Sequence, residues 1–395
     1  MNILSQVSAV TAVSLRSVPE RAGTSLVVIV GIAGVVAVLV SILSMSAGFQ
    51  SSLERSSDSR RAIVLSKGAE SEAGSGISRQ ETQVIRNAAG IRRSADGKPI
   101  VSAEVLVVAL VARARDGADT YATLRGVEEQ WSHLRPELKL IEGRTFRTGV
   151  RELIVGKAAQ RQFSGLTVGQ SITLRGGDWT VVGVFDASGS SRDSELMADA
   201  GAVVAAYNLE SFNSVSVMLE SPRPLDALEQ SLTADPTALL EAKSEPEYFA
   251  TVSRPVYRLM QRLSYSVGGV MAFGALFAAL NTMYAAIASR RVEIATLRAL
   301  GFDRVAIVIS VLIEALLLSA AGAALGALIA VAIVDGNAVS TIGNHLGTQL
   351  VYTLSVTPAT IITGTALACL VGLLGGILPA IQAARTPISS ALQSA

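Results

Sequence analysis

Residues 267–304 read VGGVMAFGALFAALNTMYAAIASRRVEIATLRALGFDR, and this stretch decides how the chain folds. Its first part contains no Asp, Glu, Lys or Arg before Arg290, and an uncharged apolar run of about 20 residues can cross a bilayer as a helix. Its second part carries four arginines, Arg290, Arg291, Arg298 and Arg304. Because positively charged short loops stay on the cytoplasmic side of a membrane, the stretch predicts a transmembrane helix followed by a cytoplasmic loop.

Three further runs are comparable in length and lack of charge. Half of the 395 residues are hydrophobic and only 16% are charged, whereas about a quarter of the residues in a soluble domain are charged. We therefore expect a membrane protein with an α-helical transmembrane bundle of four helices, at 24–47, 264–289, 305–334 and 358–381. The first run could also be a cleaved signal peptide, but its apolar core exceeds the roughly 7–15 residues of such a segment, which favours an uncleaved anchor.

The short loops predict how the helices are oriented. The loop after the second helix carries the four arginines, and the loop after the third carries neither lysine nor arginine. The arginine loop should therefore be cytoplasmic, which puts both termini inside and residues 48–262 outside the cytoplasm. Residues 1–23 then form a cytoplasmic amphipathic segment along the inner membrane surface.

Residues 48–262 mix strand and helix patterns. They predict a mixed α+β extracytoplasmic domain inserted between transmembrane helices 1 and 2, with strands at 62–66, 100–112, 153–155, 171–174, 179–185 and 214–219 and short helices at 78–89 and 225–233. Residues 245–262 have a helical pattern that runs straight into the second transmembrane helix, either as a plain connector or as an element that carries motion. The segment SGSS at 188–191 is interpreted as a flexible loop rather than a nucleophile site.

Composition argues against several classes of function. A net charge of +1 gives no basic field for nucleic acid, and the single cysteine, Cys369, can build neither a disulfide framework nor a thiolate metal site. The two histidines, His133 and His345, lie far apart in sequence, so we expect no His-ligated metal and no His-dependent triad. We predict a non-catalytic chain with no metal or cofactor of its own.

The arginine loop has the pattern of a short amphipathic helix. Apolar Val292, Ala295, Ala299 and Leu300 recur near helical spacing, and Gly301 fits a C-terminal helix stop. Topology requires positive charge alone, without a defined acid or a glycine stop. Taken on pattern, the segment is either an ordinary topology loop or a docking site for a partner.

Inside the predicted spans, one acid and several glycines stand out. Glu314 is an intramembrane carboxylate, which is costly in a bilayer and is expected to pair with an arginine or polar group near the cytoplasmic side, in a structural or coupling role. Small residues at i and i+4 let helices approach closely, and such pairs occur at Gly322/Gly326 and Gly372/Gly376. Because polar lining residues are scarce in the spans, this pattern favours transmission of motion over a solute-conducting pore.

The sequence resembles the FtsX/MacB-like ABC transporter permeases over nearly its whole length. The family segment R-x-x-E-I-x-x-L-R-A-x-G is matched after the second span by Arg290 or Arg291, with Arg290 at the better spacing, and by Glu293, Ile294, Leu297, Arg298, Ala299 and Gly301. Weaker matches are Glu314 and Ala315, Gly322, Gly326, residues 376–380, Ala383, Ala384, Pro387, Ala391 and Leu392. The pattern of Glu142, Gly143, Arg144 and Phe146, together with residues 153–156 and 179–183, resembles a MacB-type periplasmic core domain.

The resemblance implies a permease subunit of the bacterial inner membrane, with residues 263–395 as an FtsX-like domain. Its ATPase-coupling helix would contact a cytoplasmic ABC ATPase, which would bind ATP and Mg, since the sequence has no G-x-x-x-x-G-K-[ST] loop. Family permeases work as homodimers or heterodimers that transmit ATP-driven motion to the periplasm for export, and a periplasmic membrane-fusion adaptor and membrane lipid are further candidate partners. A lipoprotein-release permease of the LolC/LolE kind and an FtsX-like regulator of cell-wall hydrolases are the alternatives.

Overall fold

The computed structural model describes residues 3–16, 22–175, 177–221, 225–235, 238–342 and 349–385. The chain forms two compact units. We call them the helix unit, comprising Met1–Ala47, Arg258–Asn337 and Leu354–Ala395, and the sheet unit, comprising Gly48–Tyr257 and Ala338–Thr353. The predicted features at Pro387, Ala391, Leu392 and His345 lie outside the described residues.

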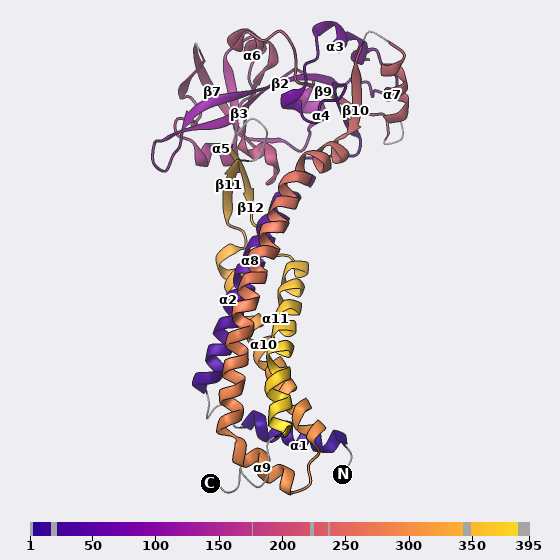
Figure 1. Cartoon of the computed structure of the whole chain (residues 1–395). Helices are drawn as coiled ribbons and strands as arrows, with labels where there is room; N and C mark the ends of the chain where they lie inside the picture. The colour runs from indigo at the N-terminus through magenta and orange to yellow at the C-terminus, as the bar shows by residue number, and fades with distance from the viewer. Residues whose placement is uncertain are drawn as a thin grey trace. The chain divides into compact units, whose positions relative to one another are not determined.

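Four described helices are long and apolar enough to cross a membrane: α2 (Ala22–Glu54), α8 (Glu245–Ser289), α10 (Arg304–Val334) and α11 (Pro358–Arg385). Two shorter helices complete the helix unit, α1 (Ile3–Arg16) and α9 (Arg291–Ala299) (Figure 1). Their sequences bury apolar stripes against one another, as where Val36 of α2 packs against Ala323 of α10 and Ala368 of α11. The predicted fold class, a four-helix bundle with a sheet-containing domain after the first helix, is confirmed.

Two of these helices extend past the predicted spans into the sheet unit. α2 continues to Glu54, and α8 begins at Glu245 and runs for 45 residues. The two units divide at Tyr257, five residues before the predicted domain boundary at 262. The uninterrupted helix predicted for residues 245–262 and the second span is therefore present, with Pro255 inside it.

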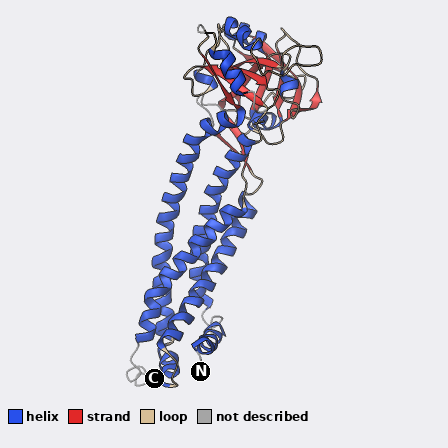
Figure 2. Cartoon of the chain, turned by 90° about the vertical axis from the view of Figure 1, so that its right-hand side faces the viewer, coloured by secondary structure: helices blue, strands red, loops and turns tan. Residues whose placement is uncertain are grey.

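Strands gather in the sheet unit, where Figure 2 shows them in red. One ten-stranded sheet runs in the order β10-β1-β9-β2-β3-β8-β5-β7-β4, with β6 paired to β7. The strands are β1 (Arg61–Ser66), β2 (Val101–Ala112), β3 (Asp119–Val127), β4 (Lys139–Gly143), β5 (Glu152–Gly156), β6 (Ser171–Leu174), β7 (Gly177–Asp186), β8 (Glu195–Asp199), β9 (Ser214–Met218) and β10 (Leu240–Ser244). Most pairs are antiparallel, but β3 pairs with β8 and β5 with β7 in parallel.

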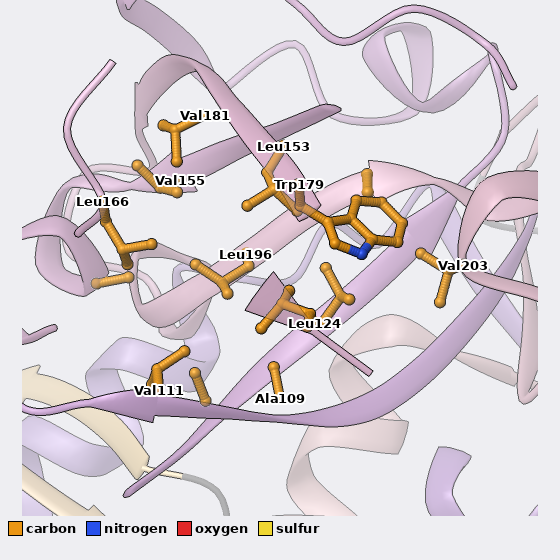
Figure 3. Packing of buried hydrophobic residues seen from close by; sticks show 14 of the residues in the cluster. Ala109, Val111, Leu124, Leu153, Val155, Leu166, Trp179, Val181, Leu196 and Val203 are labelled. Carbon is orange, nitrogen blue, oxygen red and sulfur yellow. The ribbon is translucent and has the colours of Figure 1, made fainter. Parts of the chain in front are cut away.

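Two of the apolar cores on the sheet define two lobes. The first lobe packs β1, β9, β10 and the start of β2 against α3 (Arg79–Arg86) and α7 (Leu225–Thr233). The second lobe packs the rest of β2 with β3, β5, β7 and β8 against α5 (Lys157–Gln162) and α6 (Ala200–Tyr207). Figure 3 shows Trp179 among Leu124, Leu153 and Val203 in this second core, where its side chain is fully buried. Three short helical turns lie in the connections of the sheet unit: α4 (Trp131–Leu134), η2 (Glu72–Gly74) and η3 (Ser191–Ser194).

A hairpin from the C-terminal part of the sequence belongs to the sheet unit. Residues after the third span form β11 (Ala338–Ile342) and β12 (Gln349–Thr353), which pair antiparallel. β12 contacts η3 and β3. The sequence assigned this polar stretch to the C-terminal domain because it follows the third span, whereas by its contacts it clusters with the sheet unit.

The interpretation of residues 188–191 as a flexible loop is wrong. Ser190 and Ser191 are only 3% and 7% exposed. Asp193 holds the loop by accepting hydrogen bonds from the Ala187 N–H (2.5 Å) and the Gly189 N–H (2.7 Å). The small side chains that suggested flexibility allow close packing here.

Candidate functional site

The helix expected after the second span is α9. Arg290 precedes its first turn as N-cap, and the helix ends in two stop bonds: the Gly301 N–H donates to the Arg298 carbonyl and the Phe302 N–H to the Leu297 carbonyl, each at 3.1 Å. Gly301 has φ 93°, a left-handed conformation that favours glycine. The short helix therefore begins after Arg290 and stops at Gly301, as the sequence pattern predicts.

Arg290 and Glu314 form the buried root of the site. The Arg290 side chain donates from Nη1 to Glu314 Oε2 at 3.0 Å and from Nε to Glu293 Oε2 at 3.3 Å. Arg290 and Glu314 are each 7% exposed, whereas Arg291 is exposed. The structure thus identifies Arg290 as the partner of the intramembrane acid, and it ties the start of α9 to α10.

One side of α9 is packed and the other is open. Ile294 is buried in a cluster with residues of three spans: Met283 and Ile287 of α8, Ile307, Val311 and Ala315 of α10, and Ala380 and Ala383 of α11. Ala295 is fully buried, while Val292 and Leu300 are 41% and 73% exposed. The apolar residues at helical spacing therefore divide between an anchor and an exposed face. That face consists of Arg291, Val292, Glu293, Thr296, Ala299 and Leu300.

Helix α1 lies against α10 beside this root. The Asp303 N–H, just before α10, donates to Gln6 Oε1 at 2.9 Å. Val10 is 5% exposed and lines a small cavity of about 30 Å³ together with Arg290 and Glu314. The segment predicted to be amphipathic is therefore helical over Ile3–Arg16 and packs beside the ion pair.

The four glycines singled out in the spans lie at helix–helix contacts. A Cβ on Gly326 would lie 2.5 Å from the Ala33 carbonyl oxygen of α2, and one on Gly322 would lie 2.9 Å from the Ile29 carbonyl oxygen. On α11, a Cβ on Gly372 would overlap the Ser319 hydroxyl of α10, and one on Gly376 would lie 2.9 Å from Ala315 Cβ. Each position leaves no room for a side chain, so α10 packs closely against the backbone of α2, and α11 packs closely against small side chains of α10.

The sheet-unit motif at residues 142–146 has a structural arrangement. Gly143 has φ 74°, and a Cβ there would lie 2.2 Å from the Val182 carbonyl oxygen. Arg144 binds Glu152 with two hydrogen bonds of 2.7 Å. These bonds, with those from Arg147, lower the pKa of Glu152 to about 2. The motif therefore links the end of β4 to the start of β5, across β7, with which both strands pair.

Sequence reasoning missed the charged residues buried where α8 begins. Arg61, Arg135 and Glu245 are at most 2% exposed. They stand far apart in sequence, so no local pattern marks them as neighbours. Among the described residues, no group of three or more His, Cys, Asp or Glu side chains is arranged to hold a metal ion.

Comparisons with known proteins bear on both parts of the chain. A family model described as MacB-like periplasmic core domain matches residues 24–235, more than half of the chain. A second, described as FtsX-like permease C-terminal, matches residues 265–388. A search of curated proteins found no match.

Two solved structures illustrate the similarity. The periplasmic region of MacB from Actinobacillus actinomycetemcomitans is 13% identical, with a TM-score of 0.38 over 50% of this chain and 95% of that one. The extracellular domain of the noncanonic ABC-type transporter YknZ from Gram-positive bacteria is 17% identical, with a TM-score of 0.36 over 47% of this chain and 100% of that one.

Proposed function

This chain belongs to the MacB/FtsX-like ABC transporter permease family, and from that premise we propose that it transmits ATP-driven movement from the cytoplasm to the sheet unit. The proposal is one of mechanotransmission: the chain moves and does not itself hydrolyse ATP. The work done outside the cytoplasm is export of a substrate from the periplasm or the outer leaflet.

The construction of α9 is the observation that supports the proposal. The helix is rooted by the Arg290–Glu314 ion pair and by Ile294, which packs against α8, α10 and α11, and it exposes a face with apolar Val292 and Leu300. A push on that face reaches three spans at once, because the same short helix contacts all of them. A loop that only sets topology needs neither a buried root nor an exposed apolar face.

The partner that pushes is a cytoplasmic ABC ATPase, which carries the ATP and Mg. Glu293 lies on the exposed face of α9 with a side chain 57% exposed, next to Arg291. Charged groups at a rim of apolar contacts set the choice of partner and the rate of association. Arg298 and Leu297, half-buried at the end of the helix, hold the face in position.

Orientation follows from the arginines, with both termini cytoplasmic and the sheet unit outside the inner membrane. In this arrangement α8 connects the two sides as one helix, from Ser289 at the cytoplasmic end to Glu245 in the sheet unit. The permease works as a dimer with a second copy or a related chain, in lipid, and a membrane-fusion adaptor is a candidate partner of the sheet unit.

Docking is tested by reversing the charge of Glu293. Glu293→Lys should insert normally, because added positive charge reinforces the cytoplasmic placement of the loop. The variant should no longer co-purify with the ATPase or stimulate it in liposomes. A lysine in place of Glu293 would face a patch of the ATPase that complements a negative charge, and such a like-charge contact costs several kcal/mol. Ser289→Lys is the control, because it places a lysine at the exposed end of α8, outside the proposed face, although it changes the net charge by +1 rather than +2.

Two results would refute this docking model. One is full ATPase stimulation by the Glu293→Lys chain. The other is robust ATP hydrolysis by the purified wild-type chain alone.

Orientation is tested by thiol labelling in a Cys369→Ser background, which removes the single cysteine. A cysteine at Ala95, exposed in the sheet unit, should react with an impermeant reagent in intact spheroplasts, and one at Ser289 should not. Ser190 is unsuitable because it is only 3% exposed. Labelling at Ser289 from outside would reverse the orientation.

A further inference from the structure

A network of buried charges lies where α2 and α8 enter the sheet unit. Its members are four arginines and four glutamates, all with side chains at most 12% exposed. We call it the charge network: Arg61, Arg125, Arg135, Arg192, Glu72, Glu104, Glu195 and Glu245. Burying charges costs desolvation, and apolar residues of similar volume often serve stability as well or better. A network of this size therefore calls for a role beyond holding the fold together.

Glu245 is the residue that joins the two helices. It is the first residue of α8 and is fully buried. Its Oε2 accepts hydrogen bonds from Arg61 Nε, at the start of β1, at 2.6 Å and from the Asp58 N–H, between α2 and β1, at 3.0 Å. Its Oε1 accepts one from Arg135 Nη1 at 2.7 Å. One carboxylate thus binds the start of α8 to the chain that leaves α2.

From Glu245 the ion pairs continue into both lobes. Arg135 reaches Glu104 of β2 at 3.4 Å and Ser216 of β9, in the first lobe, at 3.2 Å. Glu104 accepts a 2.7 Å hydrogen bond from Arg125 of β3. Arg125 binds Glu195, at the start of β8 in the second lobe, at 2.8 Å. A continuous series of charged hydrogen bonds therefore leads from α8 to both cores.

The end of α2 has its own contacts with the second lobe. The Ser56 and Ser191 hydroxyls lie 2.7 Å apart, and the Ser191 N–H donates to Ser56 Oγ at 3.1 Å. Ser52 Oγ donates to the Gly189 carbonyl at 3.2 Å. Ser191 begins η3, which also holds Arg192 of the charge network. The end of α2 and the start of α8 are therefore held by connected buried polar contacts, those of η3 and those of the charge network.

We infer that Glu245 is a positioning residue that converts a displacement of α8 against α2 into a rearrangement of the two lobes. The inference rests on the proposed function, which supplies the displacement. Charge-assisted hydrogen bonds are short and directional, so a shift of α8 that broke the Glu245 contacts would leave Arg61 and Arg135 buried without their acid. The two lobes must therefore move with the Glu245 carboxylate, because otherwise Arg61 and Arg135 would be buried without a partner. If apolar side chains joined α8 to the sheet unit instead, α8 could shift without leaving a buried charge unpaired.

The test compares Glu245→Gln with the matched control Glu247→Gln in the full-length chain. Glutamine keeps the shape of the side chain and removes its charge, and Glu247 is an exposed acid in the same first turn of α8. Spin labels on cysteines at Ala95 and Ala118, both exposed, report the distance between the lobes. The chain carries Cys369→Ser and is diluted with unlabelled chain in liposomes with the ATPase, so that distances within one chain are read.

Wild-type chain and Glu247→Gln should show an ATP-dependent change in this distance, and Glu245→Gln should not. A third variant, Arg61→Gln with Glu245→Gln, restores the charge balance without restoring the link. All distances are measured at a temperature at which tryptophan emission shows every variant folded. The double variant should also lack the ATP-dependent change.

Recovery of the change in the double variant would show that Glu245 only balances charge, and retention of the change in Glu245→Gln would show that the link is dispensable. Either result overturns the inference alone. A wild-type chain without any ATP-dependent change would refute the proposed function itself, and the inference with it.

Discussion

The sheet unit buries four arginines with four glutamates, whereas the helix unit packs glycine and alanine against neighbouring backbones. In the sheet unit the charge network joins β1, β2, β3 and β8 to the start of α8 through hydrogen bonds of defined direction. In the helix unit α10 meets α2 through Gly322 and Gly326, which lie against the backbone of α2. It meets α11 through Gly372 and Gly376, which lie against the small side chains of Ser319 and Ala315. Its buried ion pair, Arg290–Glu314, lies at the end next to α9.

The difference indicates how the two units can move. Contacts between small residues and backbone are non-directional, so helices that make them can rotate or slide by a small amount at low cost. Charged hydrogen bonds lose most of their energy when their geometry changes, and a buried charge without its partner is strongly destabilising. We therefore expect movement in the helix unit to be graded and movement in the sheet unit to occur as rigid lobes.

Filling a glycine contact should have the largest effect. Gly326→Leu adds a side chain whose Cβ alone would lie 2.5 Å from the Ala33 carbonyl oxygen of α2. The backbone of α2 cannot move aside as a flexible side chain would. Overpacking usually costs about 1–3 kcal/mol, and a backbone clash costs more. We expect almost no folded chain to be recovered in detergent. Gly274→Leu in α8 is the control, because no heavy atom lies within 4 Å of the position that its Cβ would take.

The yield of folded chain is measured by size-exclusion chromatography after solubilisation. If Gly326→Leu and Gly274→Leu gave equal yields, close backbone packing would not be what holds the helix unit together.

Acid should lower the stability of the sheet unit by less than Gly326→Leu lowers that of the helix unit. Burial acts to raise the pKa of Glu104, but Arg135 and Arg125 outweigh it and lower that pKa to about 2, and arginines likewise lower the pKa of Glu72 and Glu245. A lowered folded-state pKa stabilises the fold above the unfolded value of about 4.5, and that contribution is lost as pH falls toward 2. We expect the unfolding temperature to be level above pH 5 and to drop steadily below pH 4.5.

The chain supplies its own probe for this measurement. Its two tryptophans, Trp131 and Trp179, both lie in the sheet unit, so emission on heating reports that unit alone. Helix content by circular dichroism follows mainly the helix unit, which holds most of the helical residues, and should depend less on pH. An unfolding temperature for tryptophan emission that stayed constant from pH 7 to pH 3 would contradict the role assigned to the charges.

The smallest effect is expected at Gly301. Its φ of 93° strains any other residue by about 1 kcal/mol, but no heavy atom lies within 4 Å of where a Cβ would be. Gly301→Ala should assemble normally and stimulate the ATPase several-fold less, because the end of α9 frays. Gly336→Ala carries comparable strain at φ 74° with equally open space, away from α9. Equal stimulation by both variants would remove Gly301 from the coupling model.

The sequence was informative where a local pattern carries the information. Charge-free runs predicted the spans, and the helical spacing of Val292, Ala295, Ala299 and Leu300 before Gly301 predicted a short helix with its stop. The pairing of Glu314 with an arginine followed from the cost of a lone charge in a bilayer, and the structure identified Arg290. Each of these inferences depends on residues that are neighbours in sequence or on one large energy term, the cost of an unpaired charge in a bilayer.

Features that depend on long-range contacts could not be predicted. Strands β3, β4 and β8 lack a clear alternation because most of β3 and β8 is buried on both faces and β4 is exposed on both. Strand β10 alternates between buried and half-buried residues, but it is only five residues long. The loop at residues 188–191 has a flexible composition but is fixed by Asp193 and by Ser56, which lies 135 residues earlier than its partner Ser191. No sequence window contains both partners of such a contact.

The position of Glu245 also sets an order of events when the protein is made. Its bond to Arg61 spans 184 residues, and β10, which ends just before it, pairs with β1 from Ala62 to Ser66. In the proposed orientation, Arg61 and Arg135 are translocated long before their acid. The sheet unit can close only when the first turn of α8 has emerged, as the second span begins to insert. Closure of the ten-stranded sheet is therefore tied to the insertion of the second span, and the β11–β12 hairpin joins the sheet unit only after the third span. A ribosome stalled before residue 245 would leave an open sheet for quality control to remove.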